Sequence, residues 1–179
     1  VVSITASFLH WRFPLREYVM QNIPHFAEWK KDYWHKTYTI GGSIIFPRHT
    51  WSMNQARGCS AKICDRWDLT LECIRRFYAG EPTPLDKALE KDREFFNLFV
   101  DFKGYVDFFL LQDCVDKNYN VKFALETPLF VNMPMPRTLD EYKMWINSQI
   151  DFVEKRGRRI EEYIHKCGQG TDSIEGVRR

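Results

Sequence analysis

The sequence predicts a mainly helical α+β fold, in which a small β-sheet packs against three or four helices in a single domain. Apolar and small polar residues alternate at the start of the chain, as they do in a half-buried strand. Further along, apolar residues recur at intervals of three and four, as on one face of a helix. The chain has 179 residues, 44% of them hydrophobic and 16% aromatic, so it has room for one core but hardly for two.

Two segments are expected to form the sheet. In the first, residues 2–8, Val, Ile, Ala and Phe alternate with Ser and Thr. The second, Tyr38–Phe46 (YTIGGSIIF), is rich in β-branched and aromatic residues and ends at Pro47. Within it, Gly41 and Gly42 predict either a tight hairpin or a bulge where another backbone or a ligand comes close.

The region between these strands is less clear. In residues 11–22, Pro14 could open a helix, or residues 18–20 could form a short strand. Residues 24–35 predict a short amphipathic helix or an ordered loop.

An amphipathic helix is expected over residues 61–77, because its apolar residues fall on one face. Residues 79–82 (AGEP) are a stop signal. A new helix then starts, with Thr83 as its cap, Pro84 at its first position and Asp86 at the positive end of its dipole. We expect this helix to continue to Phe99.

The apolar run Phe102–Val115 is compatible with a buried helix or a central strand, and we favour the helix. Asp107 lies inside this run and would need a partner if it were buried. Residues 121–123 could form an edge strand, and the Pro-rich residues 128–136 are expected to form a loop.

Thr138 and Glu141 form a capping-box pattern that opens a long helix reaching Ile160. The polar residues 168–179 predict a flexible tail, which leaves residues 1–167 as the domain. The chain starts at Val1 without a Met, so we expect an N-terminal segment to be missing.

Composition narrows the function classes. The net charge is +2 and the pI is about 8.3, so a nucleic-acid partner is not indicated, although it is not excluded. Five cysteines, an odd number without a C-x-x-C pair, favour reduced thiols and a cytoplasmic location. No apolar run approaches the roughly 20 residues needed to span a bilayer, so no membrane partner is expected.

The densest group of charged residues lies on the helix at 61–77. Its members are spaced three and four apart and share one face: Asp65, Asp68, Glu72, Arg75 and Arg76. The carboxylates could bind a divalent metal, or one could be a general base held by an arginine. The alternative is a surface ladder in which Glu72 and Arg76 pair.

A second group of polar residues precedes this helix. Asn54, Gln55 and Arg57, followed by Gly58, suit recognition of a phosphate, a carboxylate or a base edge. The alternative is a hydrogen-bonded turn. The chain has no dinucleotide-binding glycine motif and no P-loop, so no cofactor is assigned.

The histidines show no metal-ligand spacing. His49, next to Arg48 just past the second strand, is the best candidate for acid–base work. Cys59 lies near the start of a helix, where a thiolate would be stabilised, but a catalytic cysteine also needs a histidine partner.

The motifs IGGSIIFP, NQARG, DRWDLTLECIRRFY and DFKGYVDFFLLQD occur in this order. In these motifs the chain resembles a bacterial family known as a domain of unknown function, from about Ser3 to Ile160. The family has a further N-terminal segment. The resemblance implies no activity, substrate or catalytic residue.

Three functional hypotheses follow from these patterns. The first is an intracellular enzyme or binding protein for a phosphate-bearing, nucleotide-like ligand. In this hypothesis Arg57 and either Arg75 or Arg76 neutralise the ligand, and Asn54 and Gln55 orient it. Asp68 or Glu72 acts as a base or metal ligand, and His49 is a further candidate for acid–base work. The second is a non-catalytic protein-interaction module with anchors at Trp29, Trp34 and Trp51. The third is nucleic-acid binding through Lys155, Arg156, Arg158 and Arg159 on the last helix.

Overall fold

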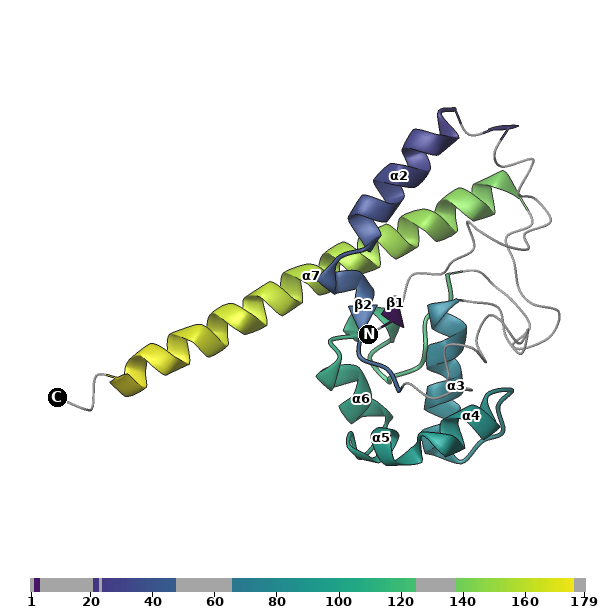
Figure 1. The fold of residues 1–179 in the computed structure, drawn as a ribbon. Helices are drawn as coiled ribbons and strands as arrows, with labels where there is room; N and C mark the ends of the chain where they lie inside the picture. The colour runs from purple at the N-terminus through teal and green to yellow at the C-terminus, as the bar shows by residue number, and fades with distance from the viewer. Residues whose placement is uncertain (1, 4–20, 23, 48–65, 125–137, 176–179) are drawn as a thin grey trace.

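The fold is mainly helical. The computed structural model describes residues 2–3, 21–22, 24–47, 66–124 and 138–175. Within these residues there are six α-helices, and the longest, α7 (Leu139–Glu175), crosses the molecule as a rod (Figure 1). Helix α2 (Phe26–Thr37) packs along the N-terminal half of α7, and the short helices α3 to α6 form a body beneath it.

The predicted small sheet is reduced, in the described residues, to one two-residue pairing. Strand β1 (Val2–Ser3) runs antiparallel to β2 (Ser43–Ile44), with Val2 opposite Ile44 and Ser3 opposite Ser43. The prediction of a strand over 38–46 is therefore wrong for most of its length. A 3₁₀ turn, η1 (Ile40–Gly42), takes its place.

The reason for this turn is the close approach of α7. A Cβ atom at Gly41 would overlap the carbonyl oxygen of Val153, and one at Gly42 would overlap that of Thr37. The expectation that another backbone approaches the glycine pair is confirmed. The expectation of a hairpin or bulge there is wrong, because the chain turns tightly to fit against α7.

The segment at 24–35 forms a helix, as one of its two interpretations predicted. Helix α2 buries Tyr33 and Thr37, and the Thr37 hydroxyl donates to the Tyr33 carbonyl at 2.7 Å. In residues 11–22, which remained ambiguous, only residues 21–22 are described, and they are helical.

Helix α3 (Trp67–Ala79) confirms the described part of the helix predicted at 61–77. It ends at Gly80, which has a φ of 70° and donates its N–H to the carbonyls of Arg76 and Phe77. The stop signal is therefore confirmed, with glycine in the left-handed conformation that it favours.

The helix predicted to start at Thr83 starts three residues later, at Asp86, and is divided in two. The Leu85 N–H donates to the Thr83 hydroxyl and the Thr83 N–H to the Asp86 carboxylate, both at 2.9 Å. Helix α4 (Asp86–Lys91) then ends at Asp92, and α5 (Arg93–Asn97) follows. The prediction of one continuous helix to Phe99 is wrong.

The apolar run at 102–115 begins as a helix. Helix α6 (Phe102–Phe108) is followed by a 3₁₀ turn, η3 (Gln112–Cys114), and Val115 pairs with Val121 in an isolated bridge. The core of the body combines aliphatic side chains with aromatic ones that pack ring against ring, as between Phe99 and Tyr105, whose centroids lie 5.3 Å apart. Pairs of this kind add to the burial of area.

Helix α7 starts as the capping box predicted. The Thr138 hydroxyl accepts the Glu141 N–H at 3.1 Å. The helix buries Trp145, Ile146 and Val153, then continues as a single rod to Glu175, into the segment predicted to be a tail. The division into a domain and a tail stays a prediction.

Candidate functional site

Asp68, predicted as a base or metal ligand, holds the start of α3 in place. It accepts Arg66 Nε at 2.9 Å through Oδ1 and Arg66 Nη2 through Oδ2. Oδ1 also accepts the Leu69 N–H at 2.8 Å, and Oδ2 the Ala124 N–H at 3.0 Å. Arg66 is fully buried. Both oxygens are occupied, so this carboxylate joins the start of α3 to the segment at Ala124 and is engaged within the fold.

Glu72 is also engaged within the fold. It is 4% exposed and accepts Arg75 Nε and Arg76 Nε, each at 2.8 Å. Burial alone would raise the pKa of Glu72, but the hydrogen bonds from the two arginines outweigh it and hold the pKa below its usual 4.5. A carboxylate stabilised in this way is a poor general base near neutral pH.

The two arginines are shared between two glutamates. Arg75 Nη2 reaches Glu81 at 3.1 Å in addition to Glu72. These four side chains have no net charge, and they lie toward the C-terminal end of α3, where the helix dipole is negative. An anion is therefore not favoured at this end of α3.

An open hollow adjoins this cluster, between the end of α3 and α4. Its walls combine an apolar floor with acidic and basic side chains: Phe77, Gly80, Glu81, Pro82, Asp86, Lys87, Glu90, Lys91 and Arg93. Three acidic and three basic residues line it, so the hollow does not select a ligand of one charge.

The remaining predicted site residues lie outside the described residues. They are His49, Asn54, Gln55 and Arg57, together with Asp65, Cys59 and Trp51. Their predicted roles stay predictions.

The basic residues of α7 do not form one surface. Lys155 pairs with Asp151 at 2.6 Å, and Arg159 binds the Asp113 carboxylate through both terminal nitrogens. Arg156 is buried, and its guanidinium donates to the carbonyls of Phe109, Ile40, Gly41 and Ser43.

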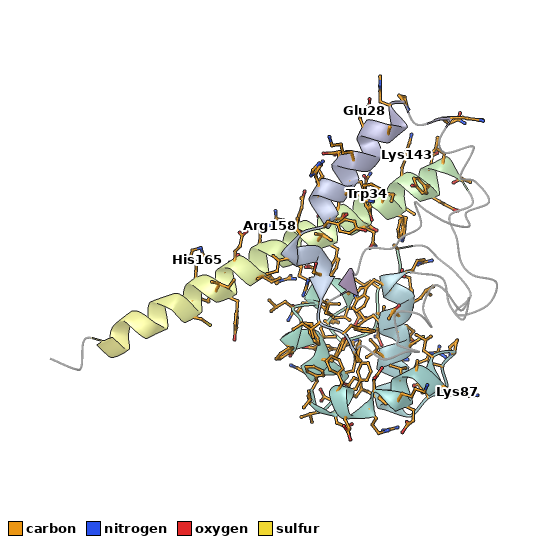
Figure 2. All side chains as sticks on the ribbon, in the orientation of Figure 1. Glu28, Trp34, Lys87, Lys143, Arg158 and His165 are labelled. Atoms are coloured by element: carbon orange, nitrogen blue, oxygen red, sulfur yellow. The ribbon has the colours of Figure 1, made fainter. Side chains whose placement is uncertain are left out.

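Of these four basic residues only Arg158 remains exposed without an ion pair to the described residues. Figure 2 shows Arg158 and His165 on the side of α7 that faces away from the body. One free arginine is a small charge for a nucleic-acid surface, which usually needs a basic stripe.

Asp107 is half-exposed, not buried. It pairs with Lys103 and accepts the Tyr119 hydroxyl at 3.2 Å. The hydrogen bond from Lys103 is the main cause that lowers the pKa of Asp107. Asp107 is thus a partly exposed carboxylate whose charge is balanced by Lys103, and not a buried charge.

The described cysteines are free thiols. Cys73 is buried, and burial raises its pKa to about 12, so it is not a nucleophile at neutral pH. Among the described residues no group of three or more His, Cys, Asp or Glu side chains could hold a metal ion. None of the described helices is both long and apolar enough to cross a bilayer.

The surface that sequence reasoning missed lies around the connection between α5 and α6. Leu98 is 73% exposed, Val100 89% and Phe108 67%. Leu98 and Val100 flank Phe99 in the chain, and the Phe108 ring packs on the Phe99 ring with centroids 5.0 Å apart. We call these three exposed residues, Leu98, Val100 and Phe108, the apolar patch.

The backbone beneath the apolar patch is strained. Val100 has a φ of 68°, a conformation in which a β-branched residue is a true outlier. The Asp101 N–H donates to the Phe99 carbonyl at 2.8 Å and closes a three-residue turn around Val100.

The start of α6 holds this turn in place. The Asp101 carboxylate accepts the Gly104 N–H at 2.7 Å, and a Cβ at Gly104 would overlap the Phe99 carbonyl oxygen. The patch therefore stands on a rigid support. A signal was present in the sequence, since residues 95–100 (FFNLFV) contain more large apolar side chains than one helix face can bury.

Of the three interaction anchors predicted from sequence, the structure describes the side chain of Trp34 alone. Trp34 is partly buried against the core, and its ring packs edge-on against Tyr38 at 6.4 Å.

Comparison with known proteins gives a family and no activity. The model of the family of unknown function DUF6994 matches residues 3–160, so the chain belongs to this family. No curated protein matches the chain, and no solved structure does. The match includes the whole apolar patch and ends at Ile160, within α7.

Proposed function

We propose that this chain is a non-catalytic protein-interaction module that binds its partner through the apolar patch. The observation that carries the proposal is the strained turn at Val100, which displays large apolar side chains to solvent. Exposed apolar patches with a well-packed support are typical of interaction sites.

Strain strengthens this interpretation. A β-branched residue in the left-handed region costs about 1–2 kcal/mol, and Asn or Gly would avoid much of that cost. An exposed Val at this position therefore contributes little to folding and weakens it locally. Strain of this kind is found at functional sites, where the surrounding structure holds it.

The charged face of α3 supports a structural role for the residues first considered catalytic. Asp68 and Glu72 are both occupied by arginines, and Arg75 and Arg76 are both occupied by glutamates. Binding of a phosphate-bearing ligand would have to break these pairs or use residues outside the described ranges. That hypothesis stays a prediction, as do the bacterial origin and cytoplasmic location.

Site-specific photo-crosslinking in the source organism tests the proposal. A photoreactive amino acid at Leu98 should give a discrete crosslinked product. The matched control places the photoreactive amino acid at Ile45, which directly follows β2 and is 61% exposed. Val100→Asn should abolish the product at position 98. Identical products at positions 98 and 45, or a product that Val100→Asn does not change, would refute the proposal.

A further inference from the structure

The charges around the apolar patch point to the chemistry of its partner. Two acidic residues border it: Glu94 lies one turn before Leu98, and Asp101 directly follows Val100. Both are exposed, and neither forms an ion pair with the described residues. Within the part of the chain that the structure describes, the Asp101 carboxylate accepts the Gly104 N–H and no cationic side chain pairs with it.

Two of the nearby basic residues form ion pairs within the molecule. Arg93 donates to Glu90 at 2.7 Å and lies over the Phe77 ring, 4.7 Å from its centroid. Lys103 pairs with Asp107 and lies over the Tyr119 ring. Lys91 is exposed and lines the hollow beside α4, on the far side of Glu94 in the chain from the patch. The unpaired charges that stand nearest to the patch in the sequence, those of Glu94 and Asp101, are therefore acidic.

Resting on the interaction proposed above, we infer that the partner is a protein segment that is apolar on one face and basic along its edges, as in a basic amphipathic helix. The apolar patch would pack on the apolar face, while Glu94 and Asp101 would meet lysines or arginines at the rim. Complementary charge at a rim gives specificity and speeds encounter more than it adds affinity.

The same charges argue against a membrane surface as the partner. Membrane-binding surfaces that insert apolar side chains usually combine them with Lys and Arg, which attract anionic lipids. Here the free rim charges are negative, and an anionic bilayer would repel them. The acidic rim thus indicates a protein-binding surface, whereas exposure of apolar side chains alone would fit a protein-binding or a membrane-binding surface equally well.

The test compares two synthetic helical peptides that differ only in charge. One contains leucine and lysine, the other leucine and glutamate, and binding to the full chain is measured by calorimetry. We expect binding of the lysine peptide, weakened by added salt, and none of the glutamate peptide. Glu94→Gln with Asp101→Asn should weaken it about threefold to tenfold. Asn keeps the oxygen that caps α6.

Val100→Asn should abolish binding of the lysine peptide, and Ile45→Asn should leave it unchanged. Equal binding of both peptides, binding of neither, or co-sedimentation with phosphatidylglycerol vesicles would overturn the inference. The crosslinking test at Leu98 is independent of peptide charge. A specific crosslink there without binding of the lysine peptide would refute the basic partner and leave the interaction module in place.

Discussion

The charged face of α3 has the composition of a reactive site but serves the fold, whereas the apolar patch beside α6 has the composition of a core but faces solvent. Asp68, Glu72, Arg75 and Arg76 are reactive residue types, yet their charges are satisfied within the fold. Leu98, Val100 and Phe108 are core residue types, yet they face solvent. Residue type is therefore a poor guide to function here, and the better guide is whether a side chain's interactions are completed inside the molecule.

The largest expected effect comes from breaking the buried pair on α3. Arg66→Met leaves the Asp68 carboxylate buried without its partner, so the free energy of unfolding should fall by about 3–5 kcal/mol. Urea unfolding followed by circular dichroism measures it. Arg93→Met removes an arginine from an exposed pair and should change stability little. An equal effect of the two substitutions would contradict the structural role of Arg66.

Glu72 should link stability to pH. Its folded pKa lies below its usual value, so its contribution is present above about pH 4.5 and is lost as the pH falls through the folded pKa. Glu72→Gln should cost about 2 kcal/mol at neutral pH and flatten the acid limb of the stability curve. Urea midpoints at pH 7 and at pH 3 test this. A variant with the acid limb of the wild type would show that Glu72 is not its source.

Val100→Asn should stabilise the fold, whereas the substitutions at Arg66 and Glu72 should destabilise it. Relief of the left-handed strain should raise the free energy of unfolding by about 1 kcal/mol. Leu98→Asn is the matched control, because Leu98 has a φ of −61° and no strain to lose. Thermal melts of both variants decide the question, and a lower melting temperature for Val100→Asn would disprove the strain.

The smallest effect is expected on α7. Among Lys155, Arg156, Arg158 and Arg159, only Arg158 is exposed without an ion pair to the described residues, so Arg158→Ala should leave stability unchanged within about 0.5 kcal/mol. Binding of a DNA duplex measured by fluorescence anisotropy should be weak both before and after the change. Tight, salt-dependent binding that Arg158→Ala removes would restore the nucleic-acid hypothesis.

Local sequence signals predicted much of the fold. The stop at Gly80, the hydrogen-bonded turn at Thr83 just before α4 and the capping box at Thr138 each depend on one or two residues and their own backbone, so a single sequence is enough to recognise them. The division of α4 from α5 at Asp92 and the turn at Gly41 were missed. The turn at Gly41 is set by packing against α7, a distant segment, and propensity does not report such packing.

The charged face of α3 shows the same limit for the site. Spacing correctly placed Asp68 and Glu72 on one helix with Arg75 and Arg76, and the predicted pair of Glu72 with Arg76 is present. Spacing could not show that Arg66 precedes the helix in an extended conformation and turns back to Asp68. The strain at Val100 is likewise a property of the backbone, and no residue pattern announces it.

The length of helix α7 means that a small tilt near its middle would move its C-terminal end by several ångströms. Its 37 residues span about 55 Å, and among the described side chains Arg156 and Arg159 make the hydrogen bonds to the body that lie nearest its C-terminal end. From Arg159 to Glu175 the rod extends about 24 Å, so a tilt of about 10° at Arg159 would displace its end by about 4 Å. Arg156 and Arg159 together thus anchor the rod to the body. Arg156 donates to four main-chain carbonyls, so substitution of neighbouring side chains would not remove its partners directly.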